Sequence, residues 1–241
     1  MTNQGLQLAT LFLLCLMWPA RSFSQTHAII SPNRAPAAKA DDFNADVYYK
    51  NKLELSVEMG VLPGNIPFAY DGLVGGDYKQ NPLHYTLVPV FTSLRWQMGN
   101  VHGPSFLRGN TDLTVTGSYT AIPRGAETHY GAVDLGLRRN FVHRNWKVAP
   151  YVELRLGAGL IDAQEPFGNN YAQGQDFTFT LFNGFGARYN FNGRYSMEVA
   201  GVYMHVSNAY MSEPKYDDNG INVVGPWIGF NMRLGKAKRL Q

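Results

Sequence analysis

Cysteine is almost absent from this chain, because Cys15 is the only one among its 241 residues. Disulfide bonds, cysteine metal sites and thiol nucleophiles are therefore excluded from everything that follows Cys15. Charged residues make up only 16% of the chain, and a formal net charge of +3 is too small to indicate nucleic-acid binding. Long apolar runs are missing too. After residue 25 no stretch approaches the roughly 18 consecutive apolar residues of a membrane-spanning helix, which excludes a helical membrane protein.

The first residues have the pattern of an export signal. An apolar run at residues 8–18 is too short to cross a bilayer and is followed by small residues. This pattern predicts a signal peptide over residues 1–25, with cleavage near Ser24 or Gln25; a short buried helix is the alternative. The polar, proline-containing stretch at residues 26–51 is expected to be a flexible N-terminal segment.

The rest of the chain is rich in glycine and aromatic residues, and its apolar and polar positions alternate. The whole chain has 25 glycines, and aromatic residues make up 13% of it. Alternation with a period of two indicates β-strands with one apolar face. The predicted strands cover residues 52–60, 83–97, 111–121, 130–141, 147–161, 175–191, 195–206 and 221–235.

An even number of strands in an exported, cysteine-free chain predicts an all-β fold, an eight-stranded antiparallel transmembrane β-barrel over residues 52–241. The faces opposite the apolar ones carry charges of both signs, which can pair inside a small, filled barrel. We expect Glu153, Arg155, Arg188 and Glu198 to form such an interior structural network. The apolar faces would then contact lipid in the bacterial outer membrane. The alternative is a soluble, lipocalin-like barrel with its apolar face inward.

The strand count also predicts which connections face the outside of the cell. With both termini in the periplasm, the loops after odd-numbered strands are extracellular, and three of these four are long, as such barrels require. These loops are residues 61–82, 122–128, 162–174 and 207–220. The connection at residues 98–110 is unusually long for the periplasmic side. The seventh strand ends outside, so His205 and Ser207 are expected on the lipid face at the height of the outer leaflet.

The end of that strand carries the most informative motif. Residues 205–209 read His-Val-Ser-Asn-Ala, and residues 219–222 read Asn-Gly-Ile-Asn. Together they resemble the signature of the PagL-type lipid A 3-O-deacylases, eight-stranded outer-membrane barrels that remove the ester-linked acyl chain at the 3 position of lipid A. Pro150-Tyr151-Val152-Glu153 and Phe179 resemble the fifth and sixth strands of that family. The resemblance covers about the last 100 residues of the chain.

The resemblance implies a serine hydrolase mechanism. Ser207 would attack the ester carbonyl, while His205 would take its proton and return it to the leaving alkoxide. The backbone N–H of Asn208 would be an oxyanion donor. Further residues that the resemblance places on the substrate side are Phe179, Asn219 and Gly220.

The chain departs from the family at the third member of the triad. The family has a glutamate where this chain has Asn222, which shares the lipid face with His205. An asparagine can orient a histidine, as in papain-like proteases, but it supplies no negative charge. The alternative is a carboxylate of the same loop: Glu213, Asp217 or Asp218.

The resemblance implies lipid A, or lipopolysaccharide in the outer leaflet, as the partner of a membrane-embedded enzyme, present as monomer or homodimer. No cofactor is expected, and no metal, because the histidines at positions 84, 102, 129 and 143 are scattered singly. Two other functions stay open. One is a non-catalytic small outer-membrane structural barrel with a degenerate triad, and the other is a soluble lipid-binding barrel.

Overall fold

The computed structural model describes residues 43–70, 83–144, 146–164, 173–212, 215–216 and 220–235. The predicted signal peptide lies outside these residues and stays a prediction. None of the helices in the described part of the chain is long and apolar enough to cross a membrane.

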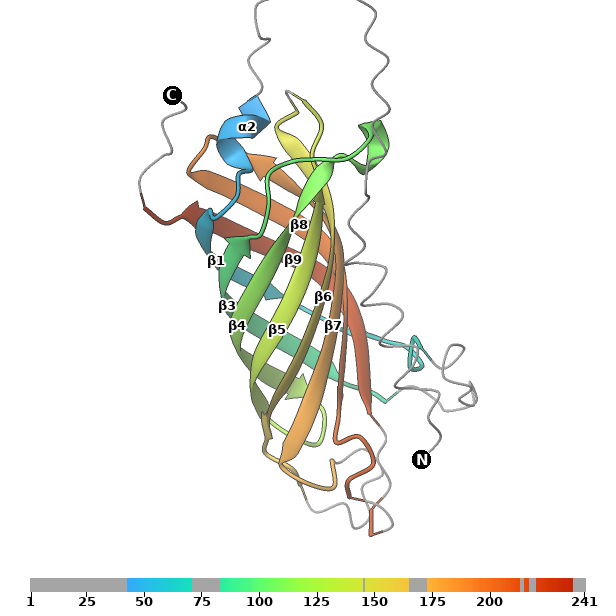
Figure 1. Ribbon diagram of the computed structural model, residues 1–241. Coiled ribbons are helices and arrows are strands. Elements are labelled where there is room, and N and C mark those ends of the chain that lie inside the picture. The colour runs from blue at the N-terminus through green and yellow to red at the C-terminus, as the bar shows by residue number, and fades with distance from the viewer. Residues whose placement is uncertain are drawn as a thin grey trace, which may run out of the picture.

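Within the described residues, eight long antiparallel strands form a closed barrel, each paired with the next along the chain (Figure 1). They are β1 (Leu53–Gly60), β3 (Thr86–Gln97), β4 (Gly109–Arg124), β5 (His129–Phe141), β6 (Val148–Ile161), β7 (Phe177–Asn190), β8 (Tyr195–Ser207) and β9 (Ile221–Arg233). Pairing of β1 with β9, from Glu54 opposite Arg233 to Gly60 opposite Trp227, closes the sheet. The predicted all-β, eight-stranded antiparallel barrel is confirmed. A further strand of two residues, β2 (Gly64–Asn65), continues the pairing along the start of β9.

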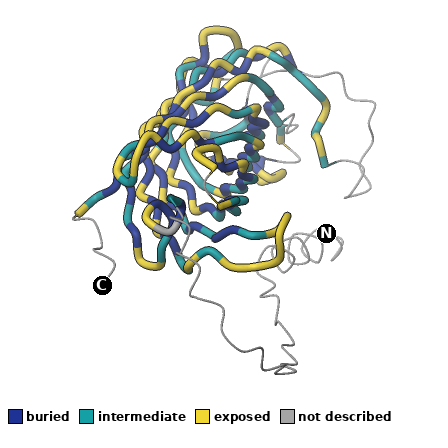
Figure 2. The backbone as a smooth tube through the Cα atoms, turned by 90° about the horizontal axis from the view of Figure 1, so that it is seen from above, coloured by how far each residue is buried: buried dark blue, intermediate teal, exposed yellow. Residues whose placement is uncertain are grey.

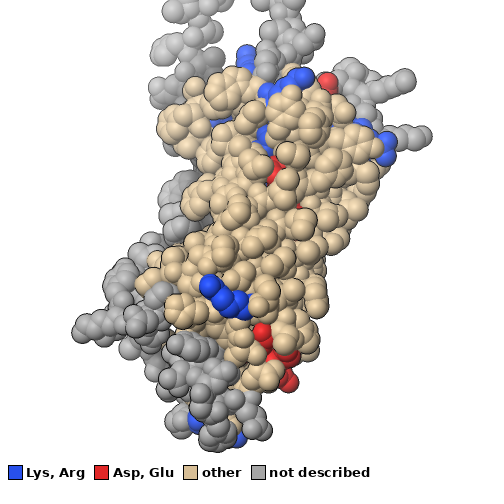
Figure 3. All heavy atoms as spheres, turned by 180° about the vertical axis from the view of Figure 1, so that it is seen from behind, with Lys and Arg blue, Asp and Glu red and all other residues tan. Residues whose placement is uncertain are grey.

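Buried and exposed residues alternate along the strands (Figure 2). Many of the buried strand residues are polar or charged, whereas the large exposed ones include many apolar side chains. In β1, Glu54 and Glu58 are fully buried, whereas Val57 and Met59 are about half exposed. Each of the eight long strands contributes exposed large apolar side chains to the outer surface, and on the side shown in Figure 3 most of the described surface carries no charged atoms. This arrangement contradicts the soluble, lipocalin-like alternative, which required the apolar faces to point inward.

A network of ion pairs fills the middle of the barrel. Arg155 binds Glu58 at 2.7 Å, and Arg138 binds Glu198 at 2.6 Å. The expected members are all there, and they are joined by residues that the sequence did not single out. The members of the network and its neighbouring pair are Glu54, Glu58, Arg95, Arg138, Glu153, Arg155, Arg188 and Glu198. Charges in a dry interior must be paired, so the balance of acids and bases is what allows this core to exist.

The interior next to this network is apolar. Trp227 packs against Phe91 and Phe182, with ring centroids 4.9 and 5.2 Å apart. The tryptophan is 4% exposed and Tyr85 is fully buried, with its hydroxyl on Glu127. Both lie inside the barrel, because their positions along the chain have interior parity.

The end of the barrel near the N-terminus of the described chain is covered by a short helix, α2 (Phe43–Val47). Val47 is buried, and the Asn44 side chain donates to the carbonyl of Trp146 at 3.0 Å. The expectation of a flexible segment through residue 51 is therefore wrong from residue 43 onward. The long connection at residues 98–108 contains the 3-10 helix η1 (Ser105–Leu107), and its Val101 packs against the apolar cluster that includes Val47 of α2.

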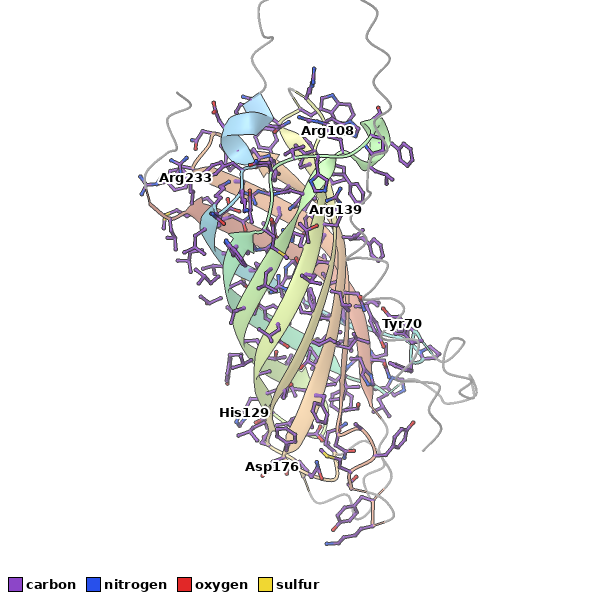
Figure 4. All side chains as sticks on the ribbon, in the orientation of Figure 1. Tyr70, Arg108, His129, Arg139, Asp176 and Arg233 are labelled. Atoms are coloured by element: carbon purple, nitrogen blue, oxygen red, sulfur yellow. The ribbon has the colours of Figure 1, made fainter. Side chains whose placement is uncertain are left out.

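The opposite end carries the connections after β4, β6 and β8, and we call it the loop end. Figure 4 places His129 and Asp176 at the loop end, and Arg108, Arg139 and Arg233 at the α2 end. Strand β8 runs toward the loop end, so its last residues lie there on the outer face.

Candidate active site

The motif at the end of β8 lies on the outer wall of the barrel. The outward row of β8 contains Met197 and Val199, which are exposed, and continues to His205 and Ser207. Parity therefore gave the correct face. In the sheet, His205 is opposite Asn222 of β9, and Ser207 is opposite Phe179 of β7. Strands β8 and β9 thus bring three polar outward residues, Ser207, His205 and Asn222, to one place, and β7 places Phe179 beside them.

These side chains form a linear hydrogen-bonded array. Ser207 Oγ lies 2.9 Å from His205 Nε2, and His205 Nδ1 lies 2.9 Å from Asn222 Oδ1. Both distances are those of good hydrogen bonds. A hydroxyl on one nitrogen of an imidazole and an oriented acceptor on the other is the arrangement that lets a histidine take a proton from a serine.

Asn222 is itself held by two further contacts. The hydroxyl of Tyr203 donates to its Oδ1 at 2.6 Å, and its Nδ2 donates to the carbonyl of Gly220 at 2.8 Å. The loop carboxylates considered as alternatives, Glu213, Asp217 and Asp218, lie outside the described residues, and so does Asn219. Because the two ring nitrogens of His205 are already bonded to Ser207 and Asn222, the geometry favours Asn222 over a carboxylate in the orienting position.

Gly220 lies directly against the histidine and the serine. A Cβ on this glycine would come within 2.5 Å of His205 Cε1 and 3.2 Å of Ser207 Cβ. Two non-bonded carbon atoms would overlap at 2.5 Å. A glycine is therefore required for the loop to lie this close to the array. The resemblance placed Gly220 on the substrate side; its observed contacts are with His205, Ser207 and Asn222.

Asn208, the residue after the serine, points into the protein. Its side chain is fully buried and donates from Nδ2 to Ser212 Oγ at 2.8 Å. The next two residues, Ala209 and Tyr210, have positive φ of 54° and 64°. A left-handed backbone costs about 1–2 kcal/mol at each residue with a side chain. The buried amide of Asn208 therefore anchors a strained turn immediately after the serine.

A segment that the sequence presented only as loop covers the site, and we call residues 66–70 the strap. It leaves β2 beside β9, where the Ile66 amide donates to the carbonyl of Asn222 at 3.3 Å. The ring of Phe68 then packs on that of His205 with centroids 4.5 Å apart, and the Ala69 amide approaches the Tyr203 hydroxyl at 3.4 Å. The sequence signal that could have indicated this cover is the pair of aromatic residues Phe68 and Tyr70 in the loop at residues 61–82.

Tyr70 completes the strap on the outer wall (Figure 4). Its ring lies 6.2 Å from that of Tyr203. Burial raises the pKa of the Tyr70 hydroxyl, and a hydrogen bond with the Asn183 side chain partly offsets that rise. Asn183 lies opposite Tyr203 in the sheet, so the strap crosses β9 and β8 and reaches β7.

The other candidate residues are less central. Phe179 is opposite Ser207, is 37% exposed, and packs edge-on against Phe177 at 5.2 Å. It therefore offers an apolar surface beside the serine. Within the described residues no group of three or more histidine, cysteine or acidic side chains has metal-binding geometry.

Comparison with protein families decides the family. The family model described as lipid A 3-O-deacylase (PagL) matches residues 90–231, more than half of the chain. The chain belongs to this family. It is accordingly an outer-membrane β-barrel of an ester hydrolase family, and family membership implies lipid A as substrate.

Three solved structures illustrate what this member of the PagL family is similar to. The crystal structure of the outer membrane enzyme PagL is 13% identical, with a TM-score of 0.46 over 74% of this chain and 98% of the other. The attachment invasion locus protein Ail of Yersinia pestis is 15% identical, with a TM-score of 0.39 over 76% and 98%. The outer membrane protein AlkL is 14% identical, with a TM-score of 0.36 over 88% and 100%. No curated protein sequence matches the chain.

Proposed function

We propose that this protein removes the ester-linked acyl chain at the 3 position of lipid A, with Ser207 as nucleophile and His205 as general base. The observation that carries the proposal is the 2.9 Å hydrogen bond between Ser207 Oγ and His205 Nε2 on the outer wall of the barrel. This hydrogen-bonded serine–histidine pair lies on the apolar outer wall, the surface that faces the acyl esters of membrane lipids.

Acyl transfer would follow the two steps of serine esterases. Ser207 Oγ attacks the ester carbonyl as His205 Nε2 takes its proton, and the tetrahedral intermediate collapses when the imidazolium returns that proton to the sugar oxygen. Water, deprotonated by His205, then attacks the acyl-serine, and the imidazolium returns the proton to Ser207 Oγ as the hydroxy fatty acid leaves. The backbone N–H of Asn208, at the start of the anchored turn, is the donor proposed for the oxyanion.

Asn222 serves in this mechanism as an orienter without charge. Its Oδ1 holds the proton of His205 on Nδ1, which leaves Nε2 free to accept from Ser207. In a serine protease the change of the triad aspartate to asparagine costs about 10⁴ in rate, largely through the wrong tautomer. Since the contacts of Asn222 favour the correct tautomer, we expect only the loss of charge stabilisation to slow this enzyme.

The surface around Ser207 suits a substrate held in the membrane. Phe179 lies beside the serine, and Met197 and Val199 continue the same outward row toward the membrane interior. An acyl chain lying along this wall would bring its ester to the height of Ser207 while its carbon tail stays in the apolar leaflet. The sugar and phosphates would remain among the loops.

Mass spectrometry of lipid A from cells that express the protein tests this proposal. We expect the loss of one 3-hydroxyacyl chain with the natural sequence and none with Ser207→Ala. Equal loss from the two proteins would exclude Ser207 as the nucleophile, and no loss from either would exclude the activity.

One observation favours a second function, a structural outer-membrane barrel whose triad has degenerated. Asn222 stands where the family has a glutamate, and it cannot stabilise the imidazolium. The Asn222→Glu variant separates the two functions. If the protein is an enzyme, the natural sequence with Asn222 deacylates lipid A. If only the Asn222→Glu variant deacylates lipid A, the natural protein is the degenerate barrel.

A further inference from the structure

Asn222 sits in the middle of a chain of hydrogen bonds that runs from one backbone group to another. The chain starts at the amide of Ala69 in the strap, passes through the hydroxyl of Tyr203 to Asn222 Oδ1, and ends where Asn222 Nδ2 meets the carbonyl of Gly220. His205 Nδ1 joins it at Asn222 Oδ1.

The two ends of this chain have fixed polarity. A backbone amide can only donate and a backbone carbonyl can only accept, whereas a hydroxyl and a side-chain amide can be turned either way. Because the Tyr203 oxygen accepts from Ala69, its proton can point at Asn222, and the atom that receives this proton is the oxygen Oδ1. Acceptance by Gly220 requires the Asn222 nitrogen at the other side. The two backbone groups therefore dictate one orientation of the asparagine amide.

Building on the proposed function, we propose that Tyr203 is a positioning residue for the deacylation. With the Ala69 amide and the Gly220 carbonyl, it holds the oxygen of Asn222 toward His205, and this keeps the imidazole proton on Nδ1. Nothing in the sequence pattern of the family motif required Tyr203 for this role; the assignment comes from the 2.6 Å contact between its hydroxyl and Asn222 Oδ1.

Fixing the orientation of the side chain matters for an asparagine in this position but not for a glutamate. Both oxygens of a carboxylate accept hydrogen bonds, so a glutamate holds the histidine proton in either orientation. A flipped asparagine amide would instead donate to His205 Nδ1 and move the imidazole proton to Nε2. A protonated Nε2 cannot accept from Ser207 Oγ, and the serine would lose its base.

Tyr203 is also well placed to act as a rigid clamp. Its side chain is only 9% exposed, and its ring lies near that of Tyr70 in the strap. The packing of Phe68 on His205 holds the imidazole from the same side. The strap thus contributes in two ways. Its Ala69 amide sets the direction of the hydrogen-bond chain, and its Phe68 ring packs on the imidazole of His205.

The Tyr203→Phe variant removes the hydroxyl and keeps the ring. We expect kcat for lipid A deacylation to fall about 2- to 12-fold, the range set by the loss of one neutral hydrogen bond, while KM stays within about twofold. Tyr119→Phe is the matched control, because Tyr119 is a 59% exposed tyrosine of β4 in the outer wall near the loop end. Natural kcat in Tyr203→Phe would overturn the proposal.

A double-mutant cycle separates positioning from a general effect on packing. If Tyr203 acts through Asn222, then Tyr203→Phe lowers kcat in the natural background and has no further effect once Asn222→Ala is present. An equal decrease in both backgrounds would show that Tyr203 acts elsewhere, and would overturn the assignment.

Nitrogen NMR of the histidine ring tests the same claim in the natural protein, whether or not the variant folds. In lipid nanodiscs with ¹⁵N-labelled histidine, the His205 signals, assigned by their loss in His205→Gln, should show the proton on Nδ1. A proton on Nε2 would overturn the inference. The two proposals fail separately: full activity of Ser207→Ala refutes the proposed function, whereas an Nε2 proton on His205 refutes only the positioning role of Tyr203.

Discussion

Replacement of Gly220 by alanine should disable the site without harming the barrel. The added Cβ would lie 2.5 Å from His205 Cε1, about 1 Å closer than an ordinary contact between carbon atoms. The imidazole must therefore move by about that distance, away from Ser207 Oγ or from Asn222 Oδ1, each of which it now meets at 2.9 Å. A misplacement of about 1 Å in a catalytic array costs about 100-fold in rate, so we expect kcat to fall by about that factor.

Gly201→Ala is the matched control for this prediction. Gly201 lies on the same strand, β8, and nothing lies within 4 Å of the Cβ it would gain. We expect this variant to keep the natural kcat and the natural resistance to unfolding. The assay is the initial rate of fatty acid release from lipid A in mixed micelles. A Gly220→Ala protein with kcat within about threefold of the natural one would refute the reasoning that the loop must close tightly on His205.

Three further changes test other parts of the structure. Phe68→Ala removes the ring that packs on His205, and we expect kcat to fall about 2- to 12-fold with little change in stability; a natural kcat would show that the strap does not support the base. Glu198→Gln leaves buried arginines without their partner and should lower the free energy of unfolding by about 3–5 kcal/mol, measured by urea titration in lipid vesicles; an unchanged midpoint would contradict the role of the interior network. Ser212→Ala breaks the anchor of Asn208 and should reduce kcat, but not KM, in the micelle assay; a loss confined to KM would place the effect on substrate binding.

Much of the barrel follows from local pattern. Strands with a period of two, separated by turn residues, were located to within a few residues, because lipid outside and paired charges inside impose opposite chemistry on alternate positions. The same parity identified the outer face for His205, Ser207 and Asn222. These features depend on one strand at a time, which is why the sequence alone reveals them.

Features that depend on distant segments were missed. The pairing of β2 with β9 carries the strap across the site, and no local pattern in residues 61–70 predicts that crossing. The helix α2 is stabilised by contacts with residues about 100 positions away, such as Asn44 with Trp146. A tryptophan near a strand end is typical of an interfacial belt, but Trp227 lies inside the barrel, where its neighbours are Phe91 and Phe182.

The candidate site shows the same division. The motif and strand parity were enough to name Ser207, His205 and Asn222, and to recognise that an asparagine replaces the family's glutamate. The partners that orient this asparagine, Tyr203 and Gly220, come from the register of β8 with β9 and from the close approach of the loop. The sequence shows which residues can form hydrogen bonds. Which atom of Asn222 faces His205 depends on the backbone groups at the two ends of the hydrogen-bond chain, and only the structure places these groups.

Covalent labelling with a lipid-like fluorophosphonate tests the central claim most directly, since such a reagent modifies a serine only where a neighbouring base activates it. The account predicts a single adduct on Ser207, identified by mass spectrometry of peptides from the protein in outer-membrane vesicles, and no adduct in His205→Gln. It also predicts that labelled protein no longer releases fatty acid from lipid A. Deacylation that continues after complete labelling of Ser207, or an active protein that the reagent labels elsewhere, would contradict the account.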